Sequence, residues 1–205
     1  MMTTIARRTC LLTLAMAALA AGQPARAQPD WVTALRSGGY VLVMRHGATH
    51  QDQADTDPLH LANIAQQRQL NDAGRAKARE IGAAMKKLGI PVGQVVSSQF
   101  FRAIETGRLM GFGEPQPTPD VSEGGQVVTP IENNRRTAAM RKLAATAQPG
   151  TNVLVVSHKP NILDAFGKDW FDVREGEISI FKPDGAGSYR LVARVQADEW
   201  AKLAQ

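Results

Sequence analysis

Three short apolar runs, each followed by polar residues and then by a helical pattern, place the strongest constraint on the fold. The runs lie at residues 40–44, 92–96 and 152–156. Short runs of β-prone residues predict buried strands, and helices between such strands predict parallel pairing through crossover connections. We therefore expect an α/β protein, with three α/β/α layers around a largely parallel central sheet.

The segments between and after these runs carry their own signals. Residues 71–88 place apolar or small residues at helical spacing and end at Gly89, which predicts a helix with a glycine stop. Further elements are expected as helices at about 100–110 and 132–147, a Gly- and Pro-rich loop or lid at 111–129, strands at 177–181 and 189–195, and a short helix from residue 198.

Charged and polar residues follow the three predicted strands. Right-handed crossovers place the carboxyl ends of parallel strands at one edge of the sheet, where open α/β sheets bind ligands. The residues expected at that edge are Arg45 and His46, then Ser97 and Ser98 with Arg102, and then Ser157 and His158. Two arginines and two histidines would thus line one pocket.

Such a pocket is suited to phosphoryl chemistry. Arginine forks match phosphate oxygens, and an imidazole can act as a nucleophile that splits hydrolysis into two steps. Two guanidinium groups can neutralise the phosphate without a metal ion. No Walker-type glycine loop is present, which argues against nucleotide triphosphate chemistry. We therefore expect neither a metal nor a cofactor.

Four ordered motifs resemble those of the histidine phosphatase superfamily, which includes phosphoglycerate mutases and acid phosphatases. They are Val-Leu-Val-Met-Arg-His-Gly-Ala-Thr at 41–49, Gln-Arg-Gln-Leu-Asn-Asp-Ala-Gly-Arg at 67–75, Val-Ser-Ser-Gln-Phe-Phe-Arg-Ala-Ile-Glu-Thr at 96–106 and Val-Val-Ser-His at 155–158. The resemblance implies a phosphoglycerate mutase-like fold and an acid-type phosphatase. It implies that His46 becomes phosphorylated and that Arg45, Arg102 and His158 bind the phosphoryl group.

The resemblance also implies a carboxylic acid that protonates the leaving oxygen, and here the chain departs from the family patterns. Lys159 stands where the acid phosphatase branch has Asp after the second His. Glu123 is the best match by location to the Glu of the mutase branch, with Glu132 and Glu177 as further candidates. Asp52, where mutases tend to carry Asn, and the compact 111–129 segment favour a phosphatase over a mutase.

Other functions remain open from the residues alone. A phosphomutase or phosphotransferase would use the same phosphohistidine, and a non-catalytic module would only bind phosphate. The partner expected in each case is a small phosphorylated molecule. The layout resembles small exported bacterial phosphatases, including those acting on lipopolysaccharide core heptose phosphate, so a sugar phosphate or an envelope glycan phosphate is a candidate substrate.

Structural interpretations compete with the catalytic ones at several positions. His46 could cap a backbone carbonyl, His158 could be a packed core residue, and Arg102 could pair with Glu105 one turn away. A metal site could be suspected from His46, His50 and His60 with Asp52, Asp55 and Asp57. Pro58 and the lack of helical periodicity favour a polar rim of the pocket for that stretch.

The first 27 residues have the pattern of a signal peptide. Arg7 and Arg8 precede an apolar run at 11–21, and Ala25-Arg26-Ala27 is a small-x-small cleavage site. The apolar run is about half of the roughly 20 residues that a membrane span needs, so no stable membrane insertion is expected. Cleavage after Ala27 would leave residues 28–205, which is the length of a single domain, and the resemblance implies that this is a histidine phosphatase domain. Export would use a general or a twin-arginine route.

Net charge gives no argument for nucleic acid binding. The formal net charge of +5 falls to +2 once Arg7, Arg8 and Arg26 are removed with the leader, which contains no acidic residue. The one cysteine, Cys10, is also in the leader. A cysteine-free exported domain fits the bacterial periplasm or full secretion.

Overall fold

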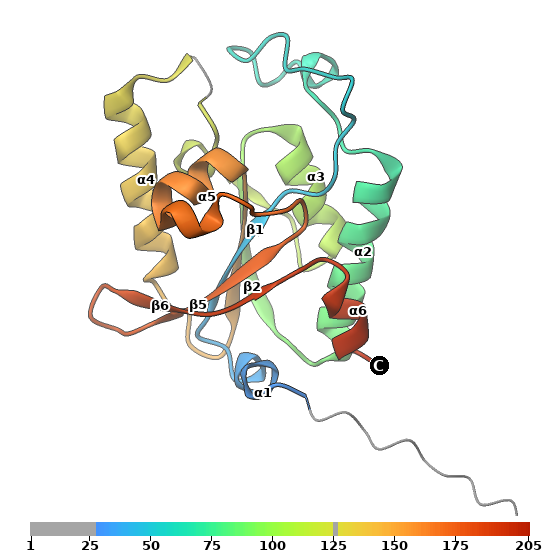
Figure 1. The fold of residues 1–205 in the computed structure, drawn as a ribbon, viewed down its shortest axis with the longest axis vertical. Helices are drawn as coiled ribbons and strands as arrows, with labels where there is room; N and C mark the ends of the chain where they lie inside the picture. Colours follow the sequence, from blue (N-terminus) through green and yellow to red (C-terminus); the bar gives the residue numbers. More distant parts are fainter. Residues whose placement is uncertain (1–27, 125–126) are drawn as a thin grey trace, which may run out of the picture.

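A six-stranded sheet runs through the computed structural model, which describes residues 28–124 and 127–205 (Figure 1). The strand order is β3-β2-β4-β1-β5-β6. The strands are β1 (Val41–Arg45), β2 (Val92–Ser98), β3 (Gln116–Thr118), β4 (Asn152–Ser157), β5 (Ile178–Pro183) and β6 (Tyr189–Val195). The expected signal peptide lies outside the described residues.

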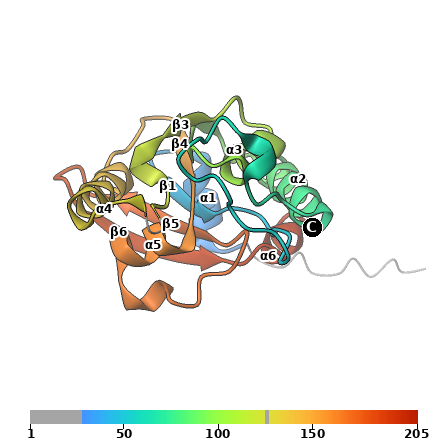
Figure 2. The ribbon, with the colours of Figure 1, turned by 90° about the horizontal axis from the view of Figure 1, so that it is seen from above.

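Helices cover both faces of this sheet (Figures 1 and 2). They are α1 (Asp30–Arg36), α2 (Asp72–Lys87), α3 (Phe101–Met110), α4 (Pro130–Ala144), α5 (Lys159–Phe166) and α6 (Glu199–Leu203), with short 3₁₀ turns η1 (Ile64–Gln66), η2 (Pro119–Val121) and η4 (Lys168–Trp170). In the described part of the chain, no helix has the length and apolarity required to cross a bilayer.

Strand direction confirms the expected fold class. β4 pairs in parallel with both β1 and β2, and β2 pairs in parallel with β3. Only the pairs β1–β5 and β5–β6 are antiparallel among the described strands. The carboxyl ends of β1, β2 and β4 therefore meet at one edge of the sheet, as the crossover argument predicts.

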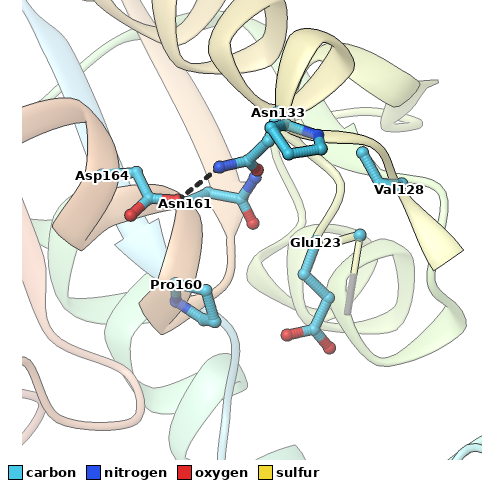
Figure 3. A pocket seen from close by; sticks show the side chains of 8 residues that line it. Glu123, Val128, Asn133, Pro160, Asn161 and Asp164 are labelled. Atoms are coloured by element: carbon cyan, nitrogen blue, oxygen red, sulfur yellow. Dashed lines mark hydrogen bonds between the residues drawn. The ribbon is translucent and has the colours of Figure 1, made fainter. Parts of the chain in front are cut away.

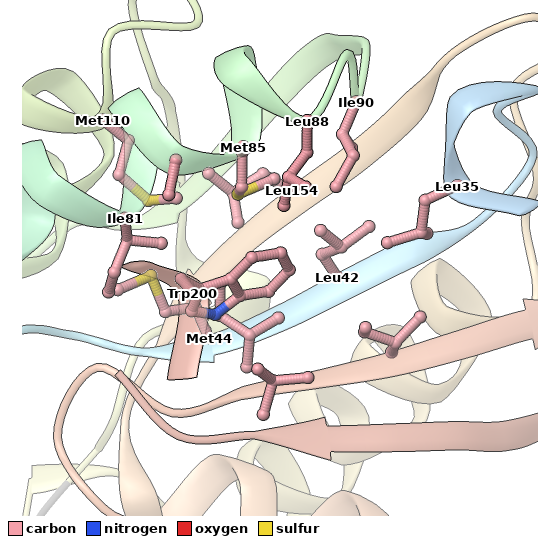
Figure 4. Packing of buried hydrophobic residues seen from close by; sticks show 14 of the residues in the cluster. Leu35, Leu42, Met44, Ile81, Met85, Leu88, Ile90, Met110, Leu154 and Trp200 are labelled. Carbon is pink, nitrogen blue, oxygen red and sulfur yellow. The ribbon is translucent and has the colours of Figure 1, made fainter. Parts of the chain in front are cut away.

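Side chains of β1 alternate between two cores, one on each face of the sheet. Leu42 and Met44 pack with residues of α1, α2, α3 and α6, including the buried Trp200 (Figure 4). Val41 and Val43 pack on the other face with residues of α4 and α5. A strand buried on both faces has a continuous apolar run, which is why residues 40–44 predicted it so clearly.

The start of α2 fixes the segment that follows β1. The Asn71 side chain caps the helix by accepting a hydrogen bond from the Gly74 N–H at 2.8 Å. A Cβ at Gly74 would lie 2.1 Å from the Ala48 carbonyl oxygen, so only glycine allows this approach. The helix therefore packs against the backbone next to His46.

The structure corrects several expected boundaries. β2 continues to Ser98 because its last residues pair with β3, and β3 and η2 lie inside the segment expected to be a loop or lid. α4 begins at Pro130, because the Thr129 side chain accepts from the Glu132 N–H and caps the helix there. It ends at Ala144 rather than 147, and α1 was not anticipated.

Candidate active site

The ends of β1 and β4 bring His46 and His158 together. Arg45 is the register partner of Ser157, and the His46 N–H donates to the Ser157 carbonyl at 3.0 Å. The two imidazole centroids are 5.1 Å apart at an interplanar angle of 61°. Both histidines are buried, with exposed fractions of 2% and 1%.

The His46 ring has a defined proton position. Its Nδ1 lies 2.8 Å from the Gly47 carbonyl oxygen, which can only accept, so Nδ1 carries the proton and Nε2 the lone pair. Burial, followed by the positive charge of Arg102, lowers the pKa of His46 to about 3. The ring is therefore neutral over most of the pH range, with Nε2 available as a nucleophile.

A chain of hydroxyl groups sets the tautomer of His158. Its Nε2 lies 2.7 Å from Ser98 Oγ, Ser98 donates to Ser122 Oγ, and Ser122 donates to the Thr118 carbonyl. Because that carbonyl only accepts, the chain runs away from His158, whose Nε2 donates. Its buried Nδ1 is then unprotonated and has no hydrogen-bond partner among the described residues. Burial, with His46 and Arg102 nearby, holds the pKa of His158 well below its usual value.

Arg102 lies at the centre of the site with no exposed side-chain surface. Its guanidinium carbon lies 4.5 Å over the Phe100 ring, its Nη1 donates to Asp55 at 2.9 Å, and its Nη2 contacts Glu123. The competing interpretation, an ion pair with Glu105, is wrong. Glu105 instead accepts from Arg75 Nε at 2.9 Å.

Arg45 and Arg68 add positive charge at the same edge. Arg45 Nη1 donates to the Val173 carbonyl at 2.9 Å, and Nη2 lies 3.5 Å from Glu175. The charge of Arg68 contributes to the lowered pKa values of both histidines. Sequence reasoning gave Arg68 no role, although its place in the motif at 67–75, just before the cap of α2, was the available signal.

Glu123 is the one candidate acid that the structure brings to the histidines. Its Oε1 contacts Arg102 and lies 3.4 Å from His158 Nδ1. Glu132 is bound by two arginines of α4, which lower its pKa to about 2. Glu177 is fully buried, where it accepts hydrogen bonds from Arg194 and the Arg174 N–H. Neither Glu132 nor Glu177 contacts the histidines.

The aspartates of the polar stretch between residues 46 and 60 contact different partners. Asp55 pairs with Arg102 and accepts from the Arg68 N–H at 3.0 Å, whereas Asp57 lies 2.7 Å from Nδ1 of the exposed His60. In residues 28–124 and 127–205, no three His, Cys, Asp or Glu side chains are grouped for a metal ion. Asp55 therefore anchors this loop on the arginine of the site.

Thr106 connects the segment after β1 to the first turn of α3. Its Oγ1 accepts from the Gly47 N–H at 3.0 Å and donates to the Arg102 carbonyl at 2.7 Å. The His46 segment and the first turn of α3 are thus held by one buried hydroxyl. The arrangement can bind a phosphoryl group between guanidinium groups, attack phosphorus from a neutral imidazole and supply a carboxyl group beside it.

Comparison with protein families gives a match to one of them. The model of the histidine phosphatase superfamily (branch 1) matches residues 41–124, which include Arg45, His46, Arg102 and Glu123. His158 lies outside the matched range. No curated protein sequence matches this chain.

Solved structures share the fold. The protein histidine phosphatase SixA complexed with tungstate has 20% identity and a TM-score of 0.54, covering 78% of this chain and 98% of its own. The putative phosphohistidine phosphatase SixA from Agrobacterium tumefaciens has 17% identity and a TM-score of 0.52, with coverages of 78% and 98%. The mycobacterial glucosyl-3-phosphoglycerate phosphatase with inorganic phosphate has 17% identity and a TM-score of 0.53, covering 78% and 99%.

Proposed function

We propose that this chain is an exported phosphomonoesterase of the histidine phosphatase superfamily, working without a metal ion through a phosphohistidine on His46. The observation that carries the proposal is the buried, neutral His46, with Nε2 free, beside Arg102 and His158 at one sheet edge. The family match over residues 41–124 and the tungstate and phosphate complexes of its structural neighbours support it.

Arg45 and Arg102 bind the phosphoryl oxygens in this proposal, and Arg68 adds to the positive potential. His158 binds a further oxygen. Its unprotonated Nδ1 accepts from a protonated phosphoryl oxygen, which a phosphomonoester has below its second pKa of about 6. Since His46 stays neutral at that pH, the site is matched to mildly acidic conditions.

Hydrolysis then proceeds in two steps. His46 Nε2 attacks phosphorus, the bond from phosphorus to the ester oxygen breaks, and the Glu123 carboxyl group donates a proton to the leaving oxygen. A water molecule next attacks the phosphohistidine while the Glu123 carboxylate accepts its proton. Inorganic phosphate leaves, and both His46 and Glu123 return to their starting forms.

The substrate in this proposal is a small phosphorylated molecule, with a sugar phosphate or an envelope glycan phosphate as the leading class. The signal-peptide pattern of residues 1–27 supports export to the periplasm or medium. The modest net charge gives no support for a nucleic acid partner, and the apolar run at 11–21 is too short to support stable membrane insertion.

The experiment is hydrolysis of an aryl phosphate by the chain from residue 28, with a chelator present. We expect turnover that His46→Ala lowers by roughly 10³-fold or more, because it removes the nucleophile. His60→Ala is the matched control, because His60 is exposed and lies outside the site. The wild type should also form an acid-labile phosphoenzyme when quenched during turnover.

Other outcomes would favour the remaining functions. Phosphate transfer to an added alcohol at the expense of hydrolysis would indicate a phosphotransferase. Vanadate binding without turnover of any ester would indicate a phosphate-binding module. Turnover that the chelator abolishes would contradict the metal-free mechanism.

A further inference from the structure

A hollow of about 370 Å³ adjoins the phosphoryl site on the side of α4 and α5. Figure 3 shows side chains that line it, among them Glu123, Asn133, Pro160, Asn161 and Asp164. Glu123 belongs to both places, because it lines the hollow and also contacts Arg102 and His158. A phosphoryl group bound at the histidines would therefore have its ester oxygen at Glu123 and its leaving group in the hollow.

Asn161 provides a buried acceptor there. Only 5% of its surface is exposed, and its Nδ2 donates to the Ser122 carbonyl at 3.0 Å. Its Oδ1 has no partner among the described residues, and Figure 3 shows this oxygen directed toward the open space between Glu123 and Pro160. Buried polar atoms without a partner are rare in folded proteins, so a donor from a ligand or water is the expected complement.

The rest of the lining also favours ligands that donate hydrogen bonds. The Asp164 carboxylate accepts from Asn133 Nδ2 at 2.9 Å and stays exposed at the rim. Among the residues that the structure describes, no lysine, arginine or histidine lines the hollow. A carboxylate or second phosphate on the leaving group would thus lie against hydrogen-bond acceptors and the negative charge of carboxylates, which would disfavour its binding. Pro130 and Pro160 supply apolar surface for the carbon face of a ring.

We propose that this hollow binds the leaving group of the substrate, and that this group is a neutral polyol such as a sugar. One of its hydroxyls donates to Asn161 Oδ1, and the Asn133–Asp164 pair accepts another at the rim. The proposal rests on the proposed phosphatase function and narrows its substrate to esters of polyhydroxylated alcohols.

The test compares kcat/KM for glucose 6-phosphate with kcat/KM for phenyl phosphate, whose leaving group has no donor in its esterified form. In Asn161→Leu we expect the ratio of the two values to fall about tenfold, the effect of one lost hydrogen bond. A loss on the phosphoryl side cancels in the ratio. Ethyl phosphate, an alkyl ester without hydroxyl donors, is measured beside phenyl phosphate, because a loss of acid catalysis at Glu123 would slow ethyl phosphate as much as glucose 6-phosphate. Asn134→Leu is the matched control, because Asn134 is exposed on α4 and does not line the hollow.

Two further ligands test the charge argument. In the wild type, 3-phosphoglycerate and phosphoethanolamine should both be poorer substrates than glucose 6-phosphate. A preference for 3-phosphoglycerate would overturn the proposal and indicate an anionic leaving group. A preference for phosphoethanolamine would also overturn it and indicate a cationic leaving group. An unchanged ratio in folded Asn161→Leu would overturn it as well.

Binding to His46→Ala reports on the hollow without turnover, and so separates this proposal from the phosphatase proposal. We expect glucose 6-phosphate to bind it more tightly than phenyl phosphate and to shift the NMR signals of the Asn161 amide. Equal binding, or no shift, would contradict the polyol site even if the enzyme hydrolyses phosphate esters. Should Asn161→Leu fail to fold, Asn133→Leu replaces it, with a smaller fall in the same ratio expected.

Discussion

The proposed phosphoryl side and the proposed leaving-group side of the site are built in different ways. The phosphoryl side consists of His46, Arg102 and His158, which are buried at the ends of parallel strands or in the first turn of the following helix. The leaving-group side consists of Glu123 on a loop and of residues in the first two turns of α4 and α5. The first is determined by the sheet topology, the second by local loop and helix geometry.

Their electrostatics differ in the same way. Guanidinium groups and two neutral imidazoles face the phosphoryl position, whereas amide and carboxylate oxygens dominate the hollow. In the proposed function, a site with these two halves would bind the anionic part of the substrate on one side and its uncharged part on the other. Substitutions on the phosphoryl side should therefore lower activity on every phosphate ester, whereas those where the leaving group binds should have smaller effects that depend on the substrate.

The largest expected effect is on the phosphoryl side, at Arg102. Arg102→Met should lower kcat/KM for any phosphate ester by roughly 10³-fold, because it removes a charge that stabilises the transferring group and leaves Asp55 and Glu123 unpaired. Steady-state kinetics on aryl and sugar phosphates would measure it. Arg108→Met, on the exposed face of the same helix, is the control. Equal losses in the two variants would remove Arg102 from the phosphoryl site.

A smaller and substrate-dependent effect is expected at Glu123, where the two sides meet. Glu123→Gln cannot donate a proton to the leaving oxygen, so we expect a loss of roughly 10²-fold on alkyl phosphates and much less on p-nitrophenyl phosphate. The quantity to measure is the dependence of kcat/KM on the pKa of the leaving group. Glu132→Gln serves as control, because Glu132 does not contact the histidines. An equal loss on both ester classes would argue against an acid role for Glu123.

The smallest expected effect, when taken per pH unit, is on stability, and it comes from the buried His46. Its pKa is about 3 in the folded chain against an ordinary value of 6.5, so between these pH values the unfolded chain binds a proton that the folded chain does not. The free energy of unfolding should therefore decrease by about 1.4 kcal/mol for each unit by which the pH is lowered across this window. His158 acts in the same direction.

Urea denaturation of wild type and His46→Asn at pH 7.0, 5.5 and 4.5 would isolate this contribution. The asparagine does not titrate, so the variant should lose less stability than the wild type as the pH falls. Parallel losses in the two proteins would mean that His46 has the same affinity for protons in the folded and unfolded chains.

The difference between the two sides also explains what the sequence could predict. Apolar runs predicted the buried strands, and topology then predicted that His46, Arg102 and His158 meet. Glu123 was proposed from the resemblance alone, and the structure brings it to His158 through β3 and η2, which the sequence did not indicate. Short edge strands and 3₁₀ turns bury few side chains and so leave a weak pattern.

Contacts between residues far apart in the sequence were the second feature that the sequence could not predict. Nothing in the residues near Arg102 indicated that Asp55 would pair with it across 47 positions of sequence. The local alternative, Glu105, lay at helical spacing but is used by Arg75. Hydrogen bonds and ion pairs between loops depend on how the loops pack, which periodicity does not encode.

The hydroxyl of Thr106 has a consequence for the rate of the proposed reaction. By holding the Gly47 amide and the Arg102 carbonyl at once, it joins the backbone next to His46 to the first turn of α3 before any ligand arrives. In the proposed mechanism these two segments carry the nucleophile and a phosphate-binding cation. The conformational entropy needed to align these two segments is then lost once, when the chain folds, rather than at every turnover. In the proposed reaction an arriving phosphate ester meets a backbone that is already in place, and the reorganisation that remains is the exchange of Arg102 from Asp55 and Glu123 to the phosphoryl oxygens.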